Sequence, residues 1–347
     1  MKPIRTAILS YGMSGEVFHA PLISAHRGFS LDVIVQRKSD SALARYPNVK
    51  IMRSADDVIS DSSIELVVVN TPNETHFEYS RRALEAGKHV VLEKPITVTT
   101  AEADELIALA RKQKRILAPF QNRRWDGGFL TVQKILKEGR LGKIAEYESH
   151  YDRFRNYIQP QTWKEVRTPG TGILYNLGSH MIDQVLVLFG LPKQVDARIG
   201  AQREGGQVDD FYDIRLQYDN FLAIIKSSYL VCDAGPQYII HGTQGSFTKY
   251  GIDPQEEALK IGGIPGSEGW GREPKEYWGR LKTMINNQAV TEIVETLPGN
   301  YLGFYQNLFE AIREGNSLAV KPEEAREVIR VIEACYESSR AKCAVKL

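Results

Sequence analysis

The sequence predicts an α/β fold, in which an N-terminal Rossmann domain with a doubly wound parallel sheet precedes an α+β domain on a large, mainly antiparallel open sheet. Three observations support this prediction. Short apolar strands alternate with helix patterns up to about residue 120, longer alternating strands follow, and 347 residues exceed what one hydrophobic core usually fills. We therefore expect two domains, residues 1–122 and 123–347.

The first domain is predicted from six short strands that are rich in Val and Ile. Their apolar residues are consecutive, as in a parallel sheet covered on both faces. The strands are Thr6–Leu9, Leu31–Gln36, Val49–Met52, Leu66–Asn70, His89–Glu93 and Ile116–Phe120. Helix patterns lie between them, including Thr75–Ala86 and Ala101–Lys114. Thr99 and Glu102 form a capping-box signature at the start of the second helix.

The second domain is predicted from longer strands that alternate in polarity and pair as hairpins. These strands are Ile144–Arg153, Val195–Arg203, Phe211–Tyr218 and Leu222–Leu230. Asp219–Asn220 and Gly242–Gly245 are predicted turns. Helices are expected at Phe129–Glu138, Tyr301–Glu314 and Pro322–Ala341, and the glycine-rich run Gly262–Gly271 is expected to be an exposed loop.

Composition excludes several classes of partner. The 44 basic residues nearly balance the 43 acidic ones, which argues against a nucleic-acid or membrane-surface partner. The three cysteines have no metal-ligand spacing, so no metal site is expected, and their pattern suits a reducing compartment. No apolar run approaches the roughly 20 residues of a membrane span, and no signal peptide is recognisable. We expect a cytoplasmic protein.

A glycine-rich loop follows the first predicted strand. Ser10-Tyr11-Gly12-Met13-Ser14-Gly15 is a GxGxxG frame with serine in the first place. The second glycine lets the backbone approach a pyrophosphate, and the third lets the helix pack close to the strand. Ser10 lacks the conformational freedom of glycine, which weakens the match. We expect Gly12, Met13, Ser14 and Gly15 to bind a dinucleotide.

The end of the second predicted strand bears on the choice of nicotinamide cofactor. An acidic residue there would bind the ribose 2′-hydroxyl of NAD. This chain instead reads Gln36-Arg37-Lys38-Ser39. Without a carboxylate to repel a 2′-phosphate, and with a guanidinium to bind it, NADP is favoured over NAD. The alternative is that Arg37 and Lys38 are only solvated basic residues.

Two further clusters are candidates for catalysis. Lys94, in Glu93-Lys94-Pro95, follows a parallel strand at the edge of the sheet where ligands bind. Asn176 and His180 are four residues apart in a predicted helix, so they share a face, and Asp183 follows three residues later. The imidazole can take a hydroxyl proton. Taken alone, the first motif also fits a loop salt bridge, and the second also fits a packed core histidine.

Together these features resemble the Gfo/Idh/MocA family, named after glucose–fructose oxidoreductase, inositol dehydrogenase and a rhizopine catabolism protein. The matching features are the glycine loop, Thr71-Pro72-Asn73 with His76, Glu93-Lys94-Pro95, and the glycine-rich segment that leads to His180. The resemblance covers essentially the whole chain. Within the family, the chain looks most like the NADP-dependent scyllo-inositol dehydrogenase branch. That likeness rests on Tyr11–Gly15 with His19–Leu22, on Asn122–Asp126 and on Lys249–Asp253.

The resemblance implies roles for individual residues. Lys94 would hydrogen-bond the reacting hydroxyl or carbonyl, and His180 would be the general acid/base. Asn176 stands where the family usually has an aspartate, so it can orient a hydroxyl but supplies no charge. The cofactor crevice would be lined by Thr71, Pro72, Asn73, His76, Glu93, Lys94 and Trp163. The family also tends to form homodimers or homotetramers through the open sheet.

The expected function is hydride transfer between NADP(H) and a secondary alcohol or ketone of a cyclic, inositol-type polyol. Arg153, Arg155 and Tyr157 follow a strand that should border the pocket, so Arg153 and Tyr157, with Lys94, Asn176 and His180, are candidate substrate contacts. The alternative is that these arginines are only solvated residues on the surface. Two other functions stay open: an aldose or ketose dehydrogenase on the same fold, and a regulatory protein that senses NADP(H) without turnover.

Overall fold

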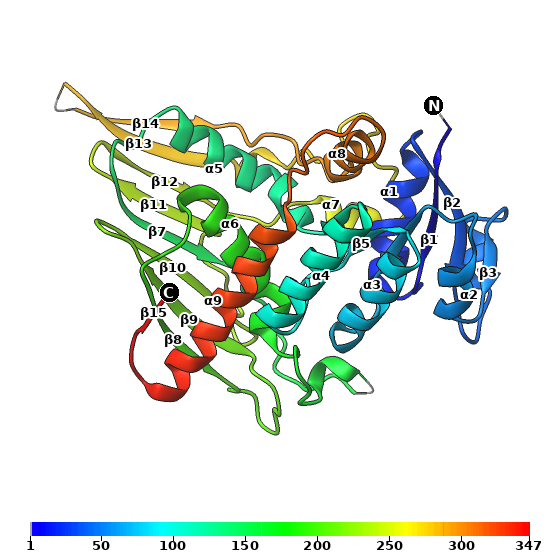
Figure 1. Ribbon diagram of the computed structural model, residues 1–347. Coiled ribbons are helices and arrows are strands. Elements are labelled where there is room, and N and C mark those ends of the chain that lie inside the picture. The colour runs from blue at the N-terminus through cyan, green and yellow to red at the C-terminus, as the bar shows by residue number, and fades with distance from the viewer. Residues whose placement is uncertain (1, 161, 287) are drawn as a thin grey trace. The chain divides into compact units, whose positions relative to one another are not determined.

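The computed structural model describes residues 2–160, 162–286 and 288–347 (Figure 1). The chain folds into two compact units. Unit 1 comprises Met1–Trp125, Gln255–Trp270 and Asn300–Arg326, and unit 2 comprises Asp126–Pro254, Gly271–Gly299 and Glu327–Leu347. The first crossing between the units lies close to the division expected after residue 122. Two later segments also belong to unit 1, and a single boundary does not include them.

Unit 1 is built on a six-stranded parallel sheet in the order β3-β2-β1-β4-β5-β6. The strands are β1 (Ile4–Ile8), β2 (Phe29–Val35), β3 (Lys50–Met52), β4 (Leu66–Val69), β5 (His89–Leu92) and β6 (Leu117–Pro119). Each lies within two residues of a predicted strand. The order reverses beside β1, which confirms the doubly wound arrangement and directs the site to the carboxyl ends of β1 and β4.

The helices of unit 1 include the pieces that connect these strands. They are η1 (Ser14–His19), α1 (Ala20–Ala25), η2 (Ser41–Ala44), α2 (Ala55–Ser60), η3 (Asn73–Thr75), α3 (His76–Glu85), α4 (Thr100–Gln113), η4 (Asn122–Trp125), α7 (Gln255–Lys260) and α8 (Leu302–Arg313). The predicted capping box is present on α4. The Thr99 hydroxyl accepts from the Glu102 amide, and the Glu102 carboxylate accepts from the Thr99 amide at 3.1 Å.

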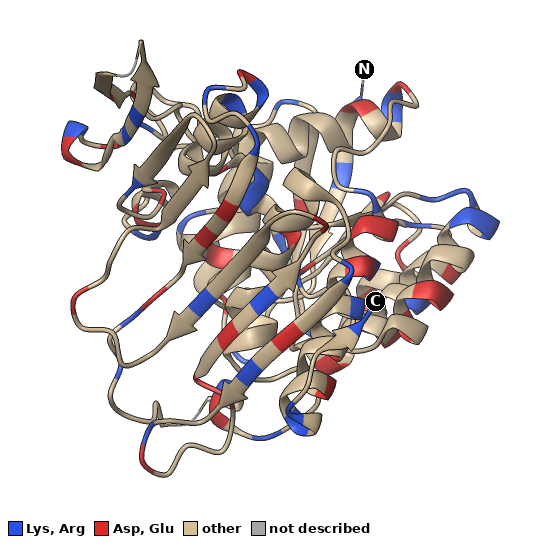
Figure 2. Ribbon diagram, turned by 90° about the vertical axis from the view of Figure 1, so that its left-hand side faces the viewer, with Lys and Arg blue, Asp and Glu red and all other residues tan. Residues whose placement is uncertain are grey.

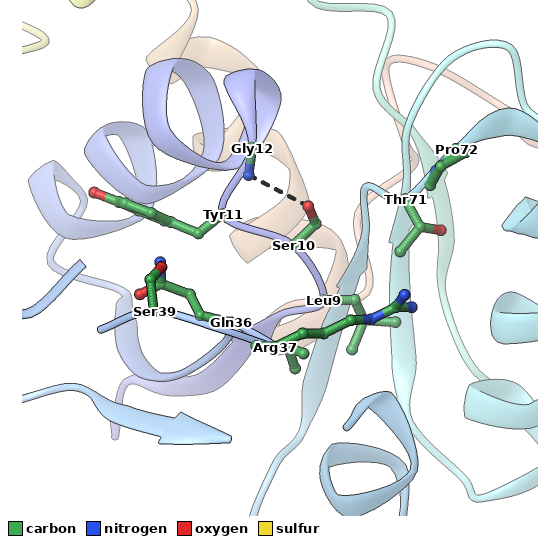
Figure 3. A pocket seen from close by; sticks show the side chains of 10 residues that line it. Leu9, Ser10, Tyr11, Gly12, Gln36, Arg37, Ser39, Thr71 and Pro72 are labelled. Atoms are coloured by element: carbon green, nitrogen blue, oxygen red, sulfur yellow. Dashed lines mark hydrogen bonds between the residues drawn. The ribbon is translucent and has the colours of Figure 1, made fainter. Parts of the chain in front are cut away.

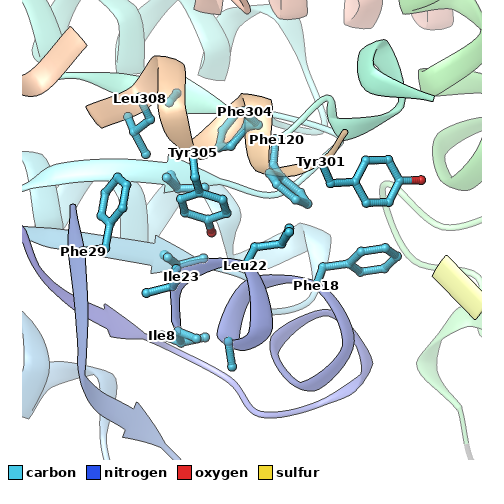
Figure 4. Packing of buried hydrophobic residues seen from close by; sticks show 14 of the residues in the cluster. Ile8, Phe18, Leu22, Ile23, Phe29, Phe120, Tyr301, Phe304, Tyr305 and Leu308 are labelled. Atoms are coloured by element: carbon cyan, nitrogen blue, oxygen red, sulfur yellow. The ribbon is translucent and has the colours of Figure 1, made fainter. Parts of the chain in front are cut away.

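An aromatic cluster joins the early and late segments of unit 1 (Figure 4). Phe120, which follows β6, meets Phe304 edge to face at 4.8 Å between ring centroids, and Phe29 meets Tyr305 at 5.4 Å. All four rings are buried. Such pairs add about 0.5–1.5 kcal/mol each to the free energy of area burial. The late helix α8 is therefore part of the core beneath the glycine loop.

Unit 2 is built on a nine-stranded sheet in the order β14-β13-β12-β11-β7-β10-β9-β8-β15. The strands are β7 (Ile144–His150), β8 (Gln194–Gly200), β9 (Phe211–Gln217), β10 (Leu222–Ser228), β11 (Tyr238–Gly242), β12 (Gly245–Lys249), β13 (Gly279–Ile285), β14 (Gln288–Val294) and β15 (Val345–Lys346). The sheet is mainly antiparallel, as predicted, but β7 runs parallel to β10. The expectation that β7 pairs in a hairpin was therefore wrong, because β7 lies between β11 and β10 in the middle of the sheet.

The two faces of this sheet differ. On β9, Tyr212, Ile214 and Leu216 alternate with more exposed residues and are buried. Basic and acidic residues are interspersed along the strands (Figure 2). The helices of unit 2 are α5 (Gly127–Lys137), η5 (Trp163–Glu165), η6 (Leu174–Gly178), α6 (Ser179–Phe189) and η7 (Lys275–Tyr277), and α9 (Pro322–Ala341) begins in unit 1 and continues in unit 2. In the part of the chain that the structure describes, each helix is too short or too polar to span a lipid bilayer.

Candidate cofactor cavity and active-site residues

A cavity of about 340 Å³ lies at the carboxyl ends of β1, β2 and β4 in unit 1 (Figure 3). Its lining residues are Leu9, Ser10, Tyr11, Gly12, Val35, Gln36, Arg37, Ser39, Thr71 and Pro72. Figure 3 shows the Arg37 side chain extended toward Thr71 and Pro72, with Tyr11 on the side of Ser39. The structure therefore brings the glycine loop, the end of β2 and the turn after β4 around one space.

The two glycines of the loop differ in their surroundings. A Cβ at Gly15 would lie 2.0 Å from the Ser10 carbonyl oxygen and 2.9 Å from Asn70 Nδ2. A Cβ at Gly12 would meet nothing nearer than Ser10 Oγ at 3.6 Å. Gly15 thus permits close packing of η1 on β1, whereas Gly12 leaves the cavity side of the loop open. The sequence assigned these two roles to the same glycines.

Serine in the first place of the motif fits the turn. Ser10 is not among the described residues with positive φ, so its backbone needs no glycine. Its Oγ accepts from the Gly12 amide at 3.3 Å, and its carbonyl accepts from Asn70 Nδ2 at 2.8 Å. Asn70 Nδ2 also lies 3.3 Å from Ser14 Oγ. Met13, the remaining loop residue of the predicted site, is half exposed and does not line the cavity.

The turn after β2 is held by hydrogen bonds that the sequence did not reveal. Arg53 Nη1 donates to the carbonyl oxygens of Gln36 at 2.9 Å and Ser39 at 2.8 Å, and Arg53 Nη2 pairs with Asp40 at 2.8 Å. Gln36 Oε1 accepts from the Ala42 amide at 3.0 Å. Gln36, predicted to bind cofactor, thus supports the turn.

The exposed residues of this turn differ in position. Arg37 lines the cavity, and among the described residues it has no ion-pair partner. Lys38 is exposed and does not line the cavity. Arg37 is therefore the basic side chain of this turn that faces the cavity.

His76 is buried and joins two turns beside the cavity. Its Nε2 lies 2.9 Å from the Thr71 carbonyl and its Nδ1 2.8 Å from the Pro95 carbonyl. Burial lowers the pKa of His76 below its usual value. Both ring nitrogens lie against backbone carbonyls. Any effect of His76 on a bound cofactor would therefore pass through the turns that carry Thr71 and Lys94. Asn73 begins the short helix η3 between them.

Glu93 and Lys94 follow β5 in unit 1. The Lys94–Pro95 peptide is cis. Glu93 is buried, with Oε1 3.1 Å from His19 Nε2 and Oε2 accepting from the Lys94 amide at 3.0 Å. Burial would raise the pKa of Glu93, but the hydrogen bond from His19 and the neighbouring Lys94 charge hold it below its usual range. Glu93 therefore stands beside Lys94 as a fixed carboxylate.

Asn176 and His180 lie in unit 2, on two consecutive helical pieces. Asn176 belongs to the π-helix η6 and is half-buried, whereas its neighbours in the helix are buried. His180 lies in the first turn of α6 and is buried, as is Asp183. The predicted helix is thus present, but its first turn is a π-helix. Such turns occur frequently at functional sites.

Asp209 fixes the start of this helix. Its Oδ2 accepts from the Leu174 amide at 2.9 Å, and its Oδ1 accepts from the Tyr336 hydroxyl at 2.8 Å. Burial raises the pKa of Asp209 despite these bonds. A Cβ at Gly172, where φ is +104°, would lie 2.1 Å from the same carboxylate. Gly172 and Asp209 therefore set the position of the backbone that leads to Asn176.

The remaining candidates lie in a segment of unit 2 that a buried arginine anchors. Arg203 donates to the Tyr157 carbonyl at 2.7 Å and pairs with Glu165 at 2.8 Å. Tyr157 and Trp163 are 60% and 40% exposed, so both side chains are accessible to solvent. Arg153 stacks its guanidinium 5.5 Å from the Tyr151 ring centroid. Arg203 thus holds a segment whose aromatic side chains stay accessible.

The cavity in unit 1 suits the pyrophosphate and the adenosine ribose of a nicotinamide dinucleotide. It borders the open side of the glycine loop at Gly12 and carries the Arg37 guanidinium without an ion-pair partner among the described residues. A phosphate needs close backbone approach and a cation, and both are present. Sequence reasoning did not select five of the cavity residues, among them Tyr11 and Ser39. The signal for these two was their position, directly beside Gly12 and two residues after Arg37.

Comparison with known proteins gives matches in both units. Residues 4–120 match the family description "Oxidoreductase family, NAD-binding Rossmann fold", and residues 133–347 match "Oxidoreductase family, C-terminal alpha/beta domain" of the same GFO/IDH/MocA family. The scyllo-inositol 2-dehydrogenase (NADP(+)) IolW of Bacillus subtilis is 40% identical over 344 residues, which cover 99% of this chain and 96% of that protein. The D-glucoside 3-dehydrogenase of Escherichia coli is 29% identical over 222 residues, 60% of this chain and 62% of the other.

Solved structures agree with this assignment. The oxidoreductase YvaA of Bacillus subtilis superposes with a TM-score of 0.97 at 40% identity, covering 100% of this chain and 99% of that one. An oxidoreductase of Bacteroides fragilis gives a TM-score of 0.91 at 46% identity, with both chains fully covered. The expected fold class and resemblance are thereby confirmed. This chain belongs to the Gfo/Idh/MocA family of oxidoreductases, as a Rossmann unit followed by the family's C-terminal α/β domain.

Proposed function

We propose that this oxidoreductase is an NADP(H)-dependent dehydrogenase of a cyclic, inositol-type polyol. The observation that carries the cofactor assignment is Arg37, which lines the cavity beside Ser39 where an NAD enzyme would place a carboxylate. The substrate class rests on Lys94, His180 and Asn176, whose side chains can hydrogen-bond the hydroxyl groups of a polyol. The 40% identical relative named as a scyllo-inositol 2-dehydrogenase supports the same class.

Ser39 would complete a 2′-phosphate site with Arg37. Gln36 Nε2 donates to Ser39 Oγ at 2.9 Å and to Ser41 Oγ at 2.8 Å. Because this donor uses an acceptor site of the Ser39 oxygen, the hydroxyl proton is left to be donated elsewhere. Ser39 lines the same cavity as Arg37. A guanidinium and a hydroxyl donor in one cavity suit the oxygens of a phosphate monoester.

The catalytic roles follow from side-chain chemistry. The Lys94 ammonium would donate to the oxygen of the reacting carbinol or carbonyl, which it stabilises as charge develops. The His180 imidazole would take the hydroxyl proton in oxidation and return it in reduction. The Asn176 amide would orient a substrate hydroxyl without adding charge. The nicotinamide, when bound, takes up or supplies the hydride.

A spectrophotometric screen of reduced nicotinamide tests this function. The purified protein would be assayed with NADP⁺ and NAD⁺ against scyllo-inositol, myo-inositol, glucose and xylose. Turnover of a cyclitol with NADP⁺ is expected. Turnover of sugars alone would favour the aldose or ketose alternative, towards which the D-glucoside 3-dehydrogenase relative points. Silence across the panel with tight NADPH binding would overturn the proposal in favour of a sensor.

We also expect a homodimer or homotetramer in solution, formed through the open face of the nine-stranded sheet. That face carries paired charges such as Lys226 and Glu148, 3.0 Å apart, with His150 2.9 Å from the same carboxylate. Light scattering on the purified protein measures the assembly. A monomer at micromolar concentration would contradict this expectation.

A further inference from the structure

A chain of buried hydrogen bonds ends on the backbone of Lys94. The Tyr305 hydroxyl lies 2.7 Å from His19 Nδ1, and His19 Nε2 lies 3.1 Å from Glu93 Oε1. The other Glu93 oxygen accepts from the Lys94 amide at 3.0 Å. All four residues belong to unit 1, and Tyr305 and His19 are fully buried. Figure 4 shows the Tyr305 hydroxyl pointing toward the helix that carries Leu22 and Ile23.

The proton positions along this chain of hydrogen bonds follow from the groups at its two ends, the Tyr305 hydroxyl and the Glu93 carboxylate. Burial and the Glu93 charge raise the pKa of Tyr305 well above its usual value, so its hydroxyl stays protonated. A buried hydroxyl needs an acceptor, and His19 Nδ1 lies at hydrogen-bond distance. Glu93 is a carboxylate, so it accepts at both oxygens. This hydrogen-bond pattern therefore has His19 accept at Nδ1 and donate at Nε2.

The packing leaves these groups little freedom. The His19 ring centroid lies 4.4 Å from that of Phe120, and Tyr305 contacts Phe29 at 5.4 Å and Phe304 at 5.4 Å. A side chain locked by aromatic neighbours transmits its orientation to its hydrogen-bond partner. Both Glu93 oxygens are held, one by His19 and one by the amide that begins Lys94. The direction in which Lys94 leaves the backbone is thus tied to α8.

We propose that Tyr305, His19 and Glu93 form a relay that positions Lys94 for the reaction, with Tyr305 and His19 as positioning residues. The proposal rests on the proposed function in one respect, namely that Lys94 contacts the reacting oxygen. It assigns a role in catalysis to α8, which follows Lys94 by about 200 residues. The charged and titratable groups that face Glu93 are His19 from η1, His76 from α3 and Lys94 itself.

Tyr305→Phe is the decisive variant because it removes one hydroxyl and leaves the aromatic ring in place. We expect kcat to fall about tenfold, the effect of one lost hydrogen bond to a constrained group, and the pH profile of kcat/KM to shift. KM and the NADPH Kd should stay within about twofold of wild type. Glu93→Gln, which keeps the shape but removes the charge, should lower kcat further, since the amide cannot accept at both positions.

Tyr46→Phe is the matched control in the same unit. The Tyr46 hydroxyl is buried and has no hydrogen-bond partner among the described residues, so its removal should leave kcat and the pH profile unchanged. A purely structural role for Tyr305 would lower the melting temperature without changing the pH profile of the folded enzyme. If Tyr305→Phe has the kcat and pH profile of wild type, the relay does not position Lys94.

The tautomer of His19 gives a readout that needs no substrate. Nitrogen-15 labelling of the seven histidines, with His19→Asn to assign the signal, should show one protonated and one unprotonated ring nitrogen at neutral pH. Loss of that signature in Tyr305→Phe supports the relay. A doubly protonated His19 in wild type would overturn it. Because this measurement is independent of turnover, a failed substrate screen would count against the proposed function only.

Discussion

The glycine loop offers a sharp test, because the structure gives its two glycines different tasks. Gly15→Ala places a Cβ 2.0 Å from the Ser10 carbonyl oxygen, which belongs to the backbone and cannot swing away. Real Cβ atoms essentially never approach closer than 3.0 Å, so the end of β1 and the start of η1 must separate by about 1 Å. Gly12→Ala meets only Ser10 Oγ, at an ordinary contact distance of 3.6 Å.

The magnitudes follow from these distances. Overpacking against backbone costs about 3 kcal/mol, at the upper end of the usual range. For a unit of this size, that corresponds to a loss of roughly 6–12 °C in Tm. Gly12→Ala should shift Tm by no more than about 1 °C. Its methyl group projects from the loop that lines the cavity, where a pyrophosphate must approach the backbone, so the NADPH Kd should rise at least about tenfold.

The assay pairs thermal unfolding without ligand with fluorescence titration of NADPH for both variants. Gly15→Ala should lose stability first and Gly12→Ala should lose affinity alone. Equal melting temperatures for the two variants would refute the packing role of Gly15. Unchanged NADPH affinity in Gly12→Ala would refute the assignment of the cavity to the dinucleotide.

Three further predictions follow from single side chains. Arg37→Ala should raise the NADPH Kd about 10- to 100-fold and the NADH Kd less than twofold, and equal losses would contradict a 2′-phosphate role. Lys94→Ala should lower kcat at least about 100-fold with NADPH binding nearly intact, whereas joint loss would make the lysine structural. Burial, then the Arg115 charge, lowers the pKa of His89 to about 4, so the folded state holds it neutral. His89 therefore adds up to about 3 kcal/mol to the free energy of unfolding above pH 6.5, and this stabilisation is lost as the pH falls to about 4. Urea unfolding of His89→Asn should lack this pH dependence.

The parallel sheet could be predicted because its strands are buried on both faces. β4 is buried at all four residues, so Leu66–Val69 reads as an uninterrupted apolar run. The capping box of α4 was equally visible, since it depends on two residues three apart. The glycine loop, Arg37 and the motif around Lys94 could be proposed as site residues for the same reason, because each is local in sequence.

Features that depend on distant contacts could not be predicted. β14 is exposed at every position but Val294, so it lacks the alternation that identifies a half-buried strand. The parallel pairing of β7 with β10 joins segments about 75 residues apart. Arg53 and Tyr305 act on the site from separate parts of the chain, through a backbone carbonyl and a buried imidazole. Neither carries a motif.

The aromatic cluster that closes over η1 also bears on the order in which the protein is made. Phe18, Phe29 and Phe120 emerge early from the ribosome, but Tyr301, Phe304 and Tyr305, which cover them, begin about 180 residues after Phe120. At about 5–20 residues per second, this leaves an apolar face of the nascent Rossmann unit uncovered for roughly 10–40 s. During that interval the growing chain exposes this apolar surface, and the core of the first unit is completed only after most of the second unit has been synthesised.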